Sequence, residues 1–297
     1  MIETVIFSRD RAMQLDLLLQ SINRHDIDKR LNVNVLFSAS EDAYRAGYAL
    51  LREKYRNTSW IEEKEYSKPH LQSNFDVLYW HNLYWLLKYK RLRRNKTDFR
   101  AALIKLLAES EAKHIIFLTD DSVFYRDIIL PDRLQNIESF SLRHGANLSG
   151  GVYETTGDWI SWDVYENDFA TDWGYPFSVD GHIYPKDKLL HIINKILFNN
   201  PNTLEGNVAC YVGEKRLFQR VFANEQSCLA GFELNRVQTV ARNNNLEISQ
   251  KLLNDYYLDG YTLNINYDKE NVRTFRPEIL KITVNKGKEQ KEIYNNG

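Results

Sequence analysis

Cysteine is scarce in this sequence, because the chain of 297 residues has only Cys210 and Cys228. They form no C-x-x-C motif and no disulfide framework, which suits a reducing compartment. No run approaches the ~18 consecutive apolar residues of a membrane-spanning helix. The N-terminus MIETVIFSRDR lacks the positive start and long apolar core of a signal peptide. We therefore expect a cytoplasmic protein.

An excess of charge and glycine-rich phosphate loops are also missing. The net charge is −1, so no global field attracts nucleic acid, and we expect no nucleic-acid partner. Neither G-x-G-x-x-G nor G-x-x-x-x-G-K-[ST] occurs, which argues against a dinucleotide site or a P-loop. Aromatic residues are abundant at 13%, including 18 Tyr and 6 Trp. Such a surplus builds stacking platforms for sugars or bases, but it also fills cores.

Apolar strands alternate with helical patterns in the first part of the chain. Strands are expected at 4–8, 33–38, 60–62 and 114–118, and helices at 12–22, 74–92, 99–112 and after an N-cap at Ser40. This alternation predicts an α/β fold with a doubly wound, mostly parallel central sheet flanked by helices. The second half is less regular, with helices expected at 186–198, 205–222 and 237–255 and a charged, partly mobile tail at 269–297.

Polar residues follow the predicted strands, as in FSRDR, FSASE and LTDDS. The carboxyl ends of parallel strands meet at one sheet edge, where ligands bind. Ser8, Arg9 and Arg11 stand beside a helix start, where backbone N–H groups and arginine favour phosphate. The alternative is a solvated helix N-terminus capped by Asp10.

The segment HIIFLTDDSVF ends an apolar strand on Asp120 and Asp121. Paired carboxylates at a strand end can hold Mg²⁺ or Mn²⁺, because hard oxygen ligands suit hard cations. The alternative is a strand that ends in a turn, since aspartate also favours turns.

The second half offers further candidates, each with an alternative. Trp173 and Tyr175 could present sugar-binding faces, and His182 could contact metal or phosphate or be a satisfied loop histidine. Glu205 could be a general base or an ordinary acid in the first turn of a helix. Arg236 could contact phosphate or acceptor or belong to a helix start.

The segment 84–96 mixes Trp, Tyr and Leu with several Lys and Arg residues. Such an element can lie on an anionic membrane surface, here the inner face of the membrane. The alternative is a solvated, charged helix end.

In order and spacing these segments resemble GT-A fold glycosyltransferases, most closely those of family 2. The first strand, loop and helix of that family resemble VIFSRDRAMQLDLLLQSI, its nucleotide-binding second strand resembles VLFSASED, and its DxD metal motif resembles IIFLTDDS. FSVDGHIYPKDKLL resembles the acceptor side, and Glu205 follows Asp180 at the spacing of the family's base. Two positions depart from the pattern: Ser122 replaces an aspartate, and the usual acid pair is Leu204-Glu205-Gly206.

The resemblance implies an inverting, metal-dependent transfer of a sugar from a nucleotide-diphosphate sugar to a saccharide or lipid-linked saccharide acceptor. It places the process, by analogy, in bacterial surface polysaccharide synthesis. Rival interpretations are a sugar-nucleotide nucleotidyltransferase and a non-catalytic carbohydrate-binding protein. The implied catalytic domain covers 1–240, with a nucleotide half at 1–125 and an acceptor half at 126–240, followed by a helical extension and tail at 241–297.

The resemblance also implies roles for individual residues. Glu205 would be the base, with Asp180 as the second candidate. Mn²⁺ or Mg²⁺ would bind at Asp120, Asp121 and Ser122. The nucleotide sugar would contact Ser8, Arg9, Arg11, Ser38, Ser40, Asn74 and Asp120, and the acceptor side would include Trp173, Tyr175, His182 and Arg236.

Overall fold

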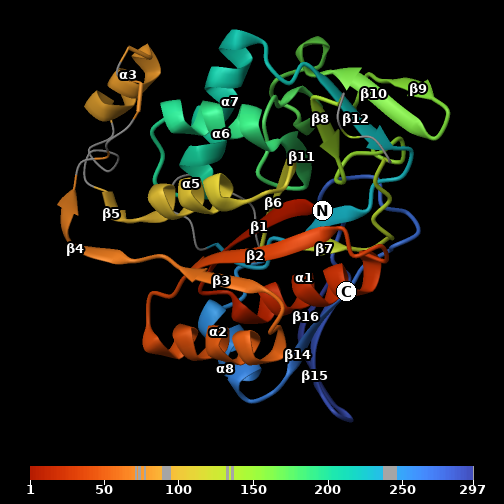
Figure 1. Cartoon of the computed structure of the whole chain (residues 1–297). Helices are drawn as coiled ribbons and strands as arrows, with labels where there is room; N and C mark the ends of the chain where they lie inside the picture. Colours follow the sequence, from red (N-terminus) through yellow and green to blue (C-terminus); the bar gives the residue numbers. More distant parts are fainter. Residues whose placement is uncertain are drawn as a thin grey trace.

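A nine-stranded sheet forms the centre of the molecule, with helices on both of its faces (Figure 1). The computed structural model describes residues 1–70, 72, 75–76, 78–88, 95–131, 134, 137–236 and 246–296. In spatial order, the strands of the sheet are β3 (Ser59–Glu62), β2 (Leu31–Ser38), β1 (Ile2–Arg9), β6 (His114–Thr119), β11 (His182–Pro185), β8 (Ser139–Ser141), β12 (Arg220–Asn224), β10 (Trp159–Asp163) and β9 (Glu154–Thr156).

One half of this sheet is parallel. β3, β2, β1 and β6 pair in parallel with one another, whereas β11 joins β6 and β8 in antiparallel register. β12 pairs in parallel with β8 and antiparallel with β10, which in turn pairs antiparallel with β9. The expected α/β fold with a flanked central sheet is confirmed. The expected parallel pairing is confirmed only for the first half, because the strands that follow β6 complete the sheet with mixed directions.

Helices cover the sheet on both faces (Figure 1). On one face lie α1 (Ala12–His25), α2 (Asp42–Lys54) and α8 (Gln250–Leu258), and on the other α5 (Phe99–Glu109), α6 (Lys186–Lys195) and α7 (Pro201–Lys215). Successive side chains of a strand point to opposite faces. Ile6 of β1 therefore belongs to one core cluster, and Val5 and Phe7 belong to the other. A strand buried on both faces reads as a continuous apolar run, which explains the sequence TVIF.

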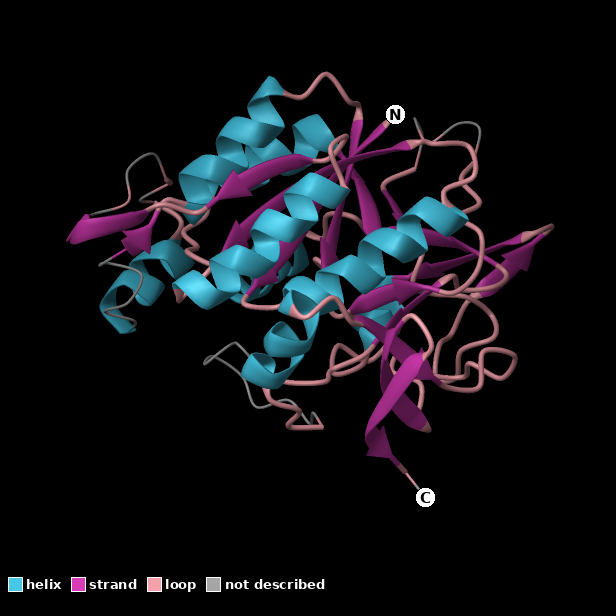
Figure 2. Cartoon of the chain, turned by 90° about the horizontal axis from the view of Figure 1, so that it is seen from below, coloured by secondary structure: helices cyan, strands magenta, loops and turns pink. Residues whose placement is uncertain are grey.

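Smaller elements complete the described structure. They are β4 (Glu65–His70), α3 (Trp80–Lys88), β5 (Asn95–Thr97), β7 (Ser122–Phe124), β13 (Leu229–Gly231) and two 3₁₀ helices at Val164–Glu166 and Asp172–Gly174. A separate three-stranded sheet consists of β14 (Thr262–Asn266), β15 (Lys281–Lys286) and β16 (Glu289–Asn295). Figure 2 shows the N- and C-termini on opposite sides of the molecule.

Several elements differ from the sequence-based expectation. The helix expected at 74–92 is α3 alone within the described residues, and Asn74 and residues 89–92 lie outside them. The helix expected from Glu205 begins at Pro201, because Asn200 caps it by accepting the Thr203 N–H. Ser40 is not the cap of α2, which begins at Asp42 without a side-chain cap.

The C-terminal region also differs. Only α8 is observed in the described part of the helix expected at 237–255, and residues 237–245 lie outside the description. The expected mobile tail is largely β15 and β16, whose inward residues Ile282 and Val284 are fully buried. In β15, Ile282 and Val284 alternate with the polar residues Thr283 and Asn285, and alternate side chains of a strand point to opposite faces. No helix in the described ranges is long and apolar enough to cross a membrane.

Candidate active site

The site lies at the carboxyl ends of β1 and β6. These strands pair in parallel with Phe7 opposite Thr119, so the residues that follow them come together. Ser8 Oγ donates to Asp120 Oδ2 at 2.7 Å, and the Arg9 N–H donates to the same oxygen at 3.2 Å. The sequence-based prediction that FSRDR and LTDDS converge at one sheet edge is therefore confirmed by these distances.

Arg11 lies across both carboxylates of the acidic pair. Its Nη1 donates to Asp120 Oδ1 at 2.8 Å and to Asp121 Oδ2 at 3.2 Å. Its Nε donates to Asn235 Oδ1 at 2.8 Å, and Nη2 donates to the Asn235 carbonyl. Arg11 is 7% exposed and Asp120 is 4% exposed, so this ion pair is screened little by solvent.

Burial and charge act in opposite directions on Asp120. Burial raises the pKa of Asp120 to about 6, while the Arg11 guanidinium lowers it and the neighbouring Asp121 raises it. The two carboxylates raise the pKa of Arg11 although burial opposes this shift, so the guanidinium stays charged. Tyr48 completes the cluster, because its hydroxyl lies 2.7 Å from Ser8 Oγ and accepts the Arg11 N–H at 3.2 Å.

These donors decide whether the acidic pair fits a resident divalent cation. Both oxygens of Asp120 already accept hydrogen bonds, and Arg11 takes one oxygen of Asp121. Ser122 is 1% exposed and directs its hydroxyl to Asp180 at 2.6 Å. Across the described ranges, no three His, Cys, Asp or Glu side chains group closely enough to hold a metal ion. The Arg11 guanidinium bridges the two carboxylates, so Mn²⁺ or Mg²⁺ would have to displace it in order to bind both of them.

Asp180 is held by an ion pair on the other side of the site. Arg143 Nη1 binds its Oδ2, and Ser122 donates to its Oδ1. Thr119 Oγ1 is a longer donor to the same oxygen, at 3.4 Å. The carboxylates around Arg143, with Asp180 foremost, raise the pKa of Arg143 although burial opposes this. Both carboxylate oxygens of Asp180 therefore already have partners.

Glu205 has fewer partners. It lies in the first turns of α7, and its Oε1 accepts the Val179 N–H at 3.0 Å. Burial raises the pKa of Glu205, while the hydrogen bonds from Val179 and Ser178 lower it and the Asp180 charge raises it. A carboxylate with a raised pKa next to a second acid is the environment of a general base or acid.

Three further predicted nucleotide contacts, Ser38, Ser40 and Arg9, lie at the same edge of the sheet. The Ser38 carbonyl accepts the Asp10 N–H at 3.3 Å, and the Ser40 N–H donates to Asp10 Oδ1 at 2.7 Å. These bonds tie the loop after β2 to the loop after β1. The Arg9 side chain is 59% exposed, so its guanidinium can reach a ligand in solution. Asn74 lies outside the described residues.

The aromatic candidates divide between the core and the site. Trp173 is 1% exposed and packs edge-on against Trp162, with ring centroids 4.9 Å apart. Its ring is therefore part of the core rather than an open sugar platform. Tyr175 is half-buried, and burial followed by the Glu205 charge raises the pKa of its hydroxyl, which places it near the candidate base.

His182 and Arg236 also occupy contrasting places. His182 is 3% exposed, and its Nε2 lies 3.3 Å from Nδ1 of the equally buried His144. Burial, helped by the Arg143 charge, lowers the pKa of His182 to about 3, so the ring is neutral. Arg236 is exposed next to Asn235.

Two residues of the cluster, Tyr48 and Arg143, were missed by the sequence analysis. Each lies far along the chain from its partners, and no short motif surrounds it. Asn235, which binds Arg11, belongs to the same short segment as Arg236, which the sequence marked as a candidate phosphate or acceptor contact.

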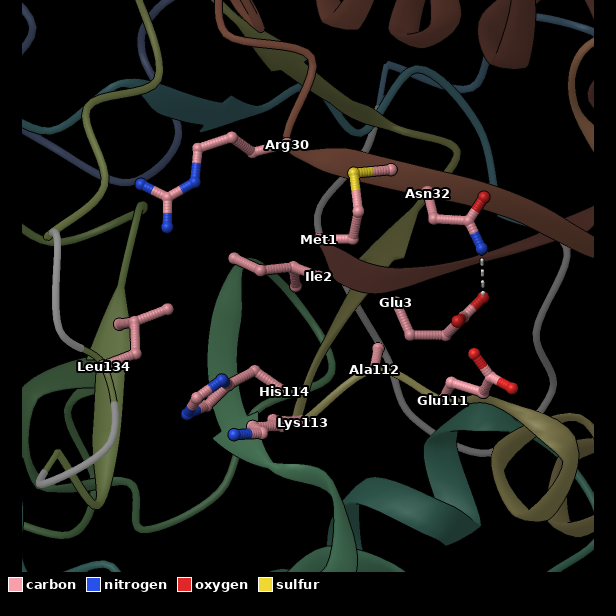
Figure 3. A pocket seen from close by; sticks show the side chains of 10 residues that line it. All are labelled: Met1, Ile2, Glu3, Arg30, Asn32, Glu111, Ala112, Lys113, His114 and Leu134. Carbon is pink, nitrogen blue, oxygen red and sulfur yellow. Dashed lines mark hydrogen bonds between the residues drawn. The ribbon is translucent and has the colours of Figure 1, made fainter.

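A pocket of ≈ 550 Å³ lies at the opposite edge of the sheet (Figure 3). Its lining includes Ile2 and Glu3 of β1, Asn32 of β2 and His114 of β6, which stand at the amino ends of these strands. Asn32 Nδ2 donates to Glu3 Oε1 at 3.0 Å, the bond drawn in Figure 3. The acidic cluster follows the carboxyl ends of β1 and β6, so this pocket is separate from the candidate active site.

The comparisons with known proteins point to sugar transfer. A curated relative, the bifunctional glycosyltransferase pgtA of Dictyostelium discoideum, is 22% identical over 322 residues. The alignment covers 90% of this chain and 38% of the relative, so the chain spans well under half of that protein. The sequence resemblance to glycosyltransferases is thereby confirmed. No protein-family model matches the chain, and the narrower assignment to family 2 stays a prediction.

The chain is also similar to solved structures of S. aureus TarS and of the bifunctional glycosyltransferase WbbM. S. aureus TarS 1-349 in complex with UDP-GlcNAc has a TM-score of 0.42 and 14% identity, covering 77% of this chain and 58% of that one. The bifunctional WbbM apo structure has a TM-score of 0.37 and 13% identity, covering 70% and 37%.

Proposed function

We propose that this protein transfers a sugar from a nucleotide-diphosphate sugar to an acceptor hydroxyl. The observation that supports this most is the hydrogen-bonded cluster of Ser8, Arg11 and Asp120 at the carboxyl ends of β1 and β6. The same site includes Glu205, whose carboxylate accepts the Val179 N–H. The carboxyl edge of a parallel sheet is where α/β proteins bind nucleotides. The relationship to a curated glycosyltransferase agrees with this proposal.

In the proposed reaction, Glu205 accepts the proton of the acceptor hydroxyl as its oxygen attacks the anomeric carbon. The bond from that carbon to the diphosphate oxygen breaks, and the nucleoside diphosphate leaves. A single displacement of this kind inverts the anomeric configuration. Glu205 is favoured over Asp180 because Asp180 is committed to Arg143 and Ser122, whereas Glu205 accepts the Val179 N–H.

The exposed Arg9 is proposed to contact the diphosphate, because a guanidinium binds phosphate oxygens in bidentate fashion. The buried Asp120 and Arg11 would act as positioning residues that fix the loop carrying Arg9. A divalent cation remains a prediction, and no step of this reaction depends on it. A role in bacterial surface polysaccharide synthesis and the use of a lipid-linked acceptor likewise remain predictions.

A panel of nucleotide sugars tests the proposal. The full chain is incubated with each donor, with and without Mn²⁺, and release of nucleoside diphosphate is followed in the presence of mixed saccharide acceptors. We expect turnover with at least one donor and a raised melting temperature with that donor. Stabilisation by a donor without release or transfer would favour a binding protein instead.

A further inference from the structure

Helix α3 presents an apolar stripe to solvent. Trp80, Leu83, Tyr84 and Leu87 are 59%, 54%, 41% and 65% exposed, and they follow the i, i+3, i+4, i+7 spacing of one helix face. Leu78, which precedes the helix, is 90% exposed. A surface helix of a globular protein normally buries its apolar face against the core. An exposed apolar stripe of this kind is typical of a surface that binds another protein or a membrane.

The opposite face of α3 is fixed to the body of the protein. Asn82 is fully buried, its Nδ2 donates to the Lys195 carbonyl at 2.7 Å, and its Oδ1 accepts the Leu197 N–H at 3.1 Å. The ring of Tyr79 packs edge-on against Tyr211 of α7, with centroids 5.0 Å apart.

A further side-chain contact adds to this anchor, since His81 Nδ1 lies 2.9 Å from Glu214 Oε1. Figure 1 shows α3 at the outer edge of the molecule, beyond α7. The polar anchor therefore holds the apolar stripe outward in one orientation, as expected of a surface that meets a partner.

Charge selects the kind of partner. The sequence from 88 to 96, which continues the chain from α3, has six Lys or Arg residues and no acidic residue. Basic residues next to an amphipathic helix favour anionic lipid headgroups, because their charges are attracted to the negative membrane surface. A second copy of this chain would bring two such basic runs together, and their repulsion would oppose the contact.

We propose that the stripe of α3 (Leu78, Trp80, Leu83, Tyr84 and Leu87) docks on an anionic phospholipid surface. The stripe enters the boundary between headgroups and acyl chains, where Trp and Tyr are favoured because one end of each ring is apolar and the other polar. This surface begins before the segment 84–96 marked by the sequence and includes Trp80 and Leu83.

The test is sedimentation of the full chain with vesicles of phosphatidylcholine alone or of phosphatidylcholine with added phosphatidylglycerol. We expect binding to the anionic vesicles that weakens with salt, and little binding to the neutral ones. The variant Trp80→Ser/Leu83→Ser/Leu87→Ser should lower the partition constant at least ~10-fold, because three apolar groups leave the interface.

A matched control carries the same number of exposed apolar-to-serine changes elsewhere, at Ile129, Val152 and Leu280. It should bind vesicles like the unmodified chain, and melting temperatures should show that both variants fold. Equal binding by the stripe variant, absence of vesicle binding, or equal binding to neutral vesicles would each overturn the proposal. So would a dimer of the unmodified chain that the stripe variant loses, because the occupant would then be a second copy.

Discussion

At Glu205 the carboxylate accepts hydrogen bonds from the Val179 N–H, at 3.0 Å, and from Ser178, whereas the carboxylate of Asp180 forms an ion pair with Arg143 and accepts the Ser122 hydroxyl. The change Glu205→Gln keeps the shape of this site and removes the group that takes the proton. We expect kcat to fall by about 10²–10⁴, the usual range for a lost general base, with donor affinity unchanged. Initial rates and calorimetry with the donor measure the two effects. Glu166→Gln, at an exposed acid, is the control, and normal turnover of Glu205→Gln would move the base elsewhere.

The pH dependence of the rate gives a second check on Glu205. Burial raises the pKa of this carboxyl above its usual value, so it stays protonated to a higher pH than an exposed glutamate. The base is active only when deprotonated, and the rate should therefore rise with pH through this raised pKa. We expect the acidic limb of the kcat profile to vanish in Glu205→Gln. An unchanged limb would assign it to another group.

The Arg11 guanidinium forms ion pairs with two carboxylates, and one of them, Asp120, is only 4% exposed. Removing one partner of a buried ion pair leaves an uncompensated charge, so Arg11→Met should lower the free energy of unfolding by about 3–5 kcal/mol. The exposed Arg9→Met is the control and should change stability little. Urea denaturation measures both.

Removal of Arg11 also frees oxygens of Asp120 and Asp121 for a cation. We expect Mn²⁺ to raise the melting temperature of Arg11→Met more than that of the unmodified chain. Equal, large stabilisation of both proteins by Mn²⁺ alone would show that the guanidinium does not compete with metal.

At the scale of elements, a carboxyl with a raised pKa lies at the end of β3. Glu63 follows this strand, and its N–H donates to the Phe37 carbonyl of β2 at 2.8 Å. Burial raises the pKa of Glu63 to about 7, with the Thr97 hydroxyl and the Arg9 charge opposing the shift.

Because the pKa of Glu63 is higher in the folded protein than in the unfolded chain, folding is more favourable when this carboxyl is protonated. The free energy of unfolding should therefore fall as pH rises from about 5 to about 8, by up to ~3 kcal/mol. Glu63→Gln should remove this slope, since the amide does not titrate. Denaturation midpoints across this range measure it, with Glu62→Gln as the neighbouring control. A slope that survives in Glu63→Gln would belong to another group.

At the scale of the whole molecule, one core joins the two ends of the sequence. Leu253, Leu263 and Ile282 belong to the same buried cluster as Ile6 and Leu15. Asn235 also binds Arg11, so residues after 230 complete the first loop of the site.

A chain that ends at residue 240 should therefore fail to fold, because it would expose the apolar face of α1 and α2 that α8 and β14 cover. We expect aggregation or rapid proteolysis of the fragment 1–240, and a single unfolding transition for the full chain. A soluble fragment with an independent transition would make 1–240 a domain of its own, as the sequence predicted.

The sequence-based predictions were accurate where local interactions determine the structure and inaccurate where the structure depends on contacts between distant parts of the chain. The strands at 4–8, 33–38 and 114–118 were predictable because their apolar runs are buried on both faces. The helix expected at 74–92 begins later than predicted, at Trp80, and residues 89–92 lie outside the described ranges. The mixed direction of the second half was not predictable, since the register of short strands depends on distant partners.

The sequence by itself determined the α/β layout of the first half and the polar residues that end β1, β2 and β6, because hydrophobic periodicity and turn chemistry act locally. It also carried the order of motifs that resembles glycosyltransferases. Only the tertiary structure decided that Arg11 bridges Asp120 and Asp121, that Arg143 binds Asp180, and that Trp173 and His182 are buried. These contacts join residues far apart in the chain, so their charges and burial exist only once the fold brings them together.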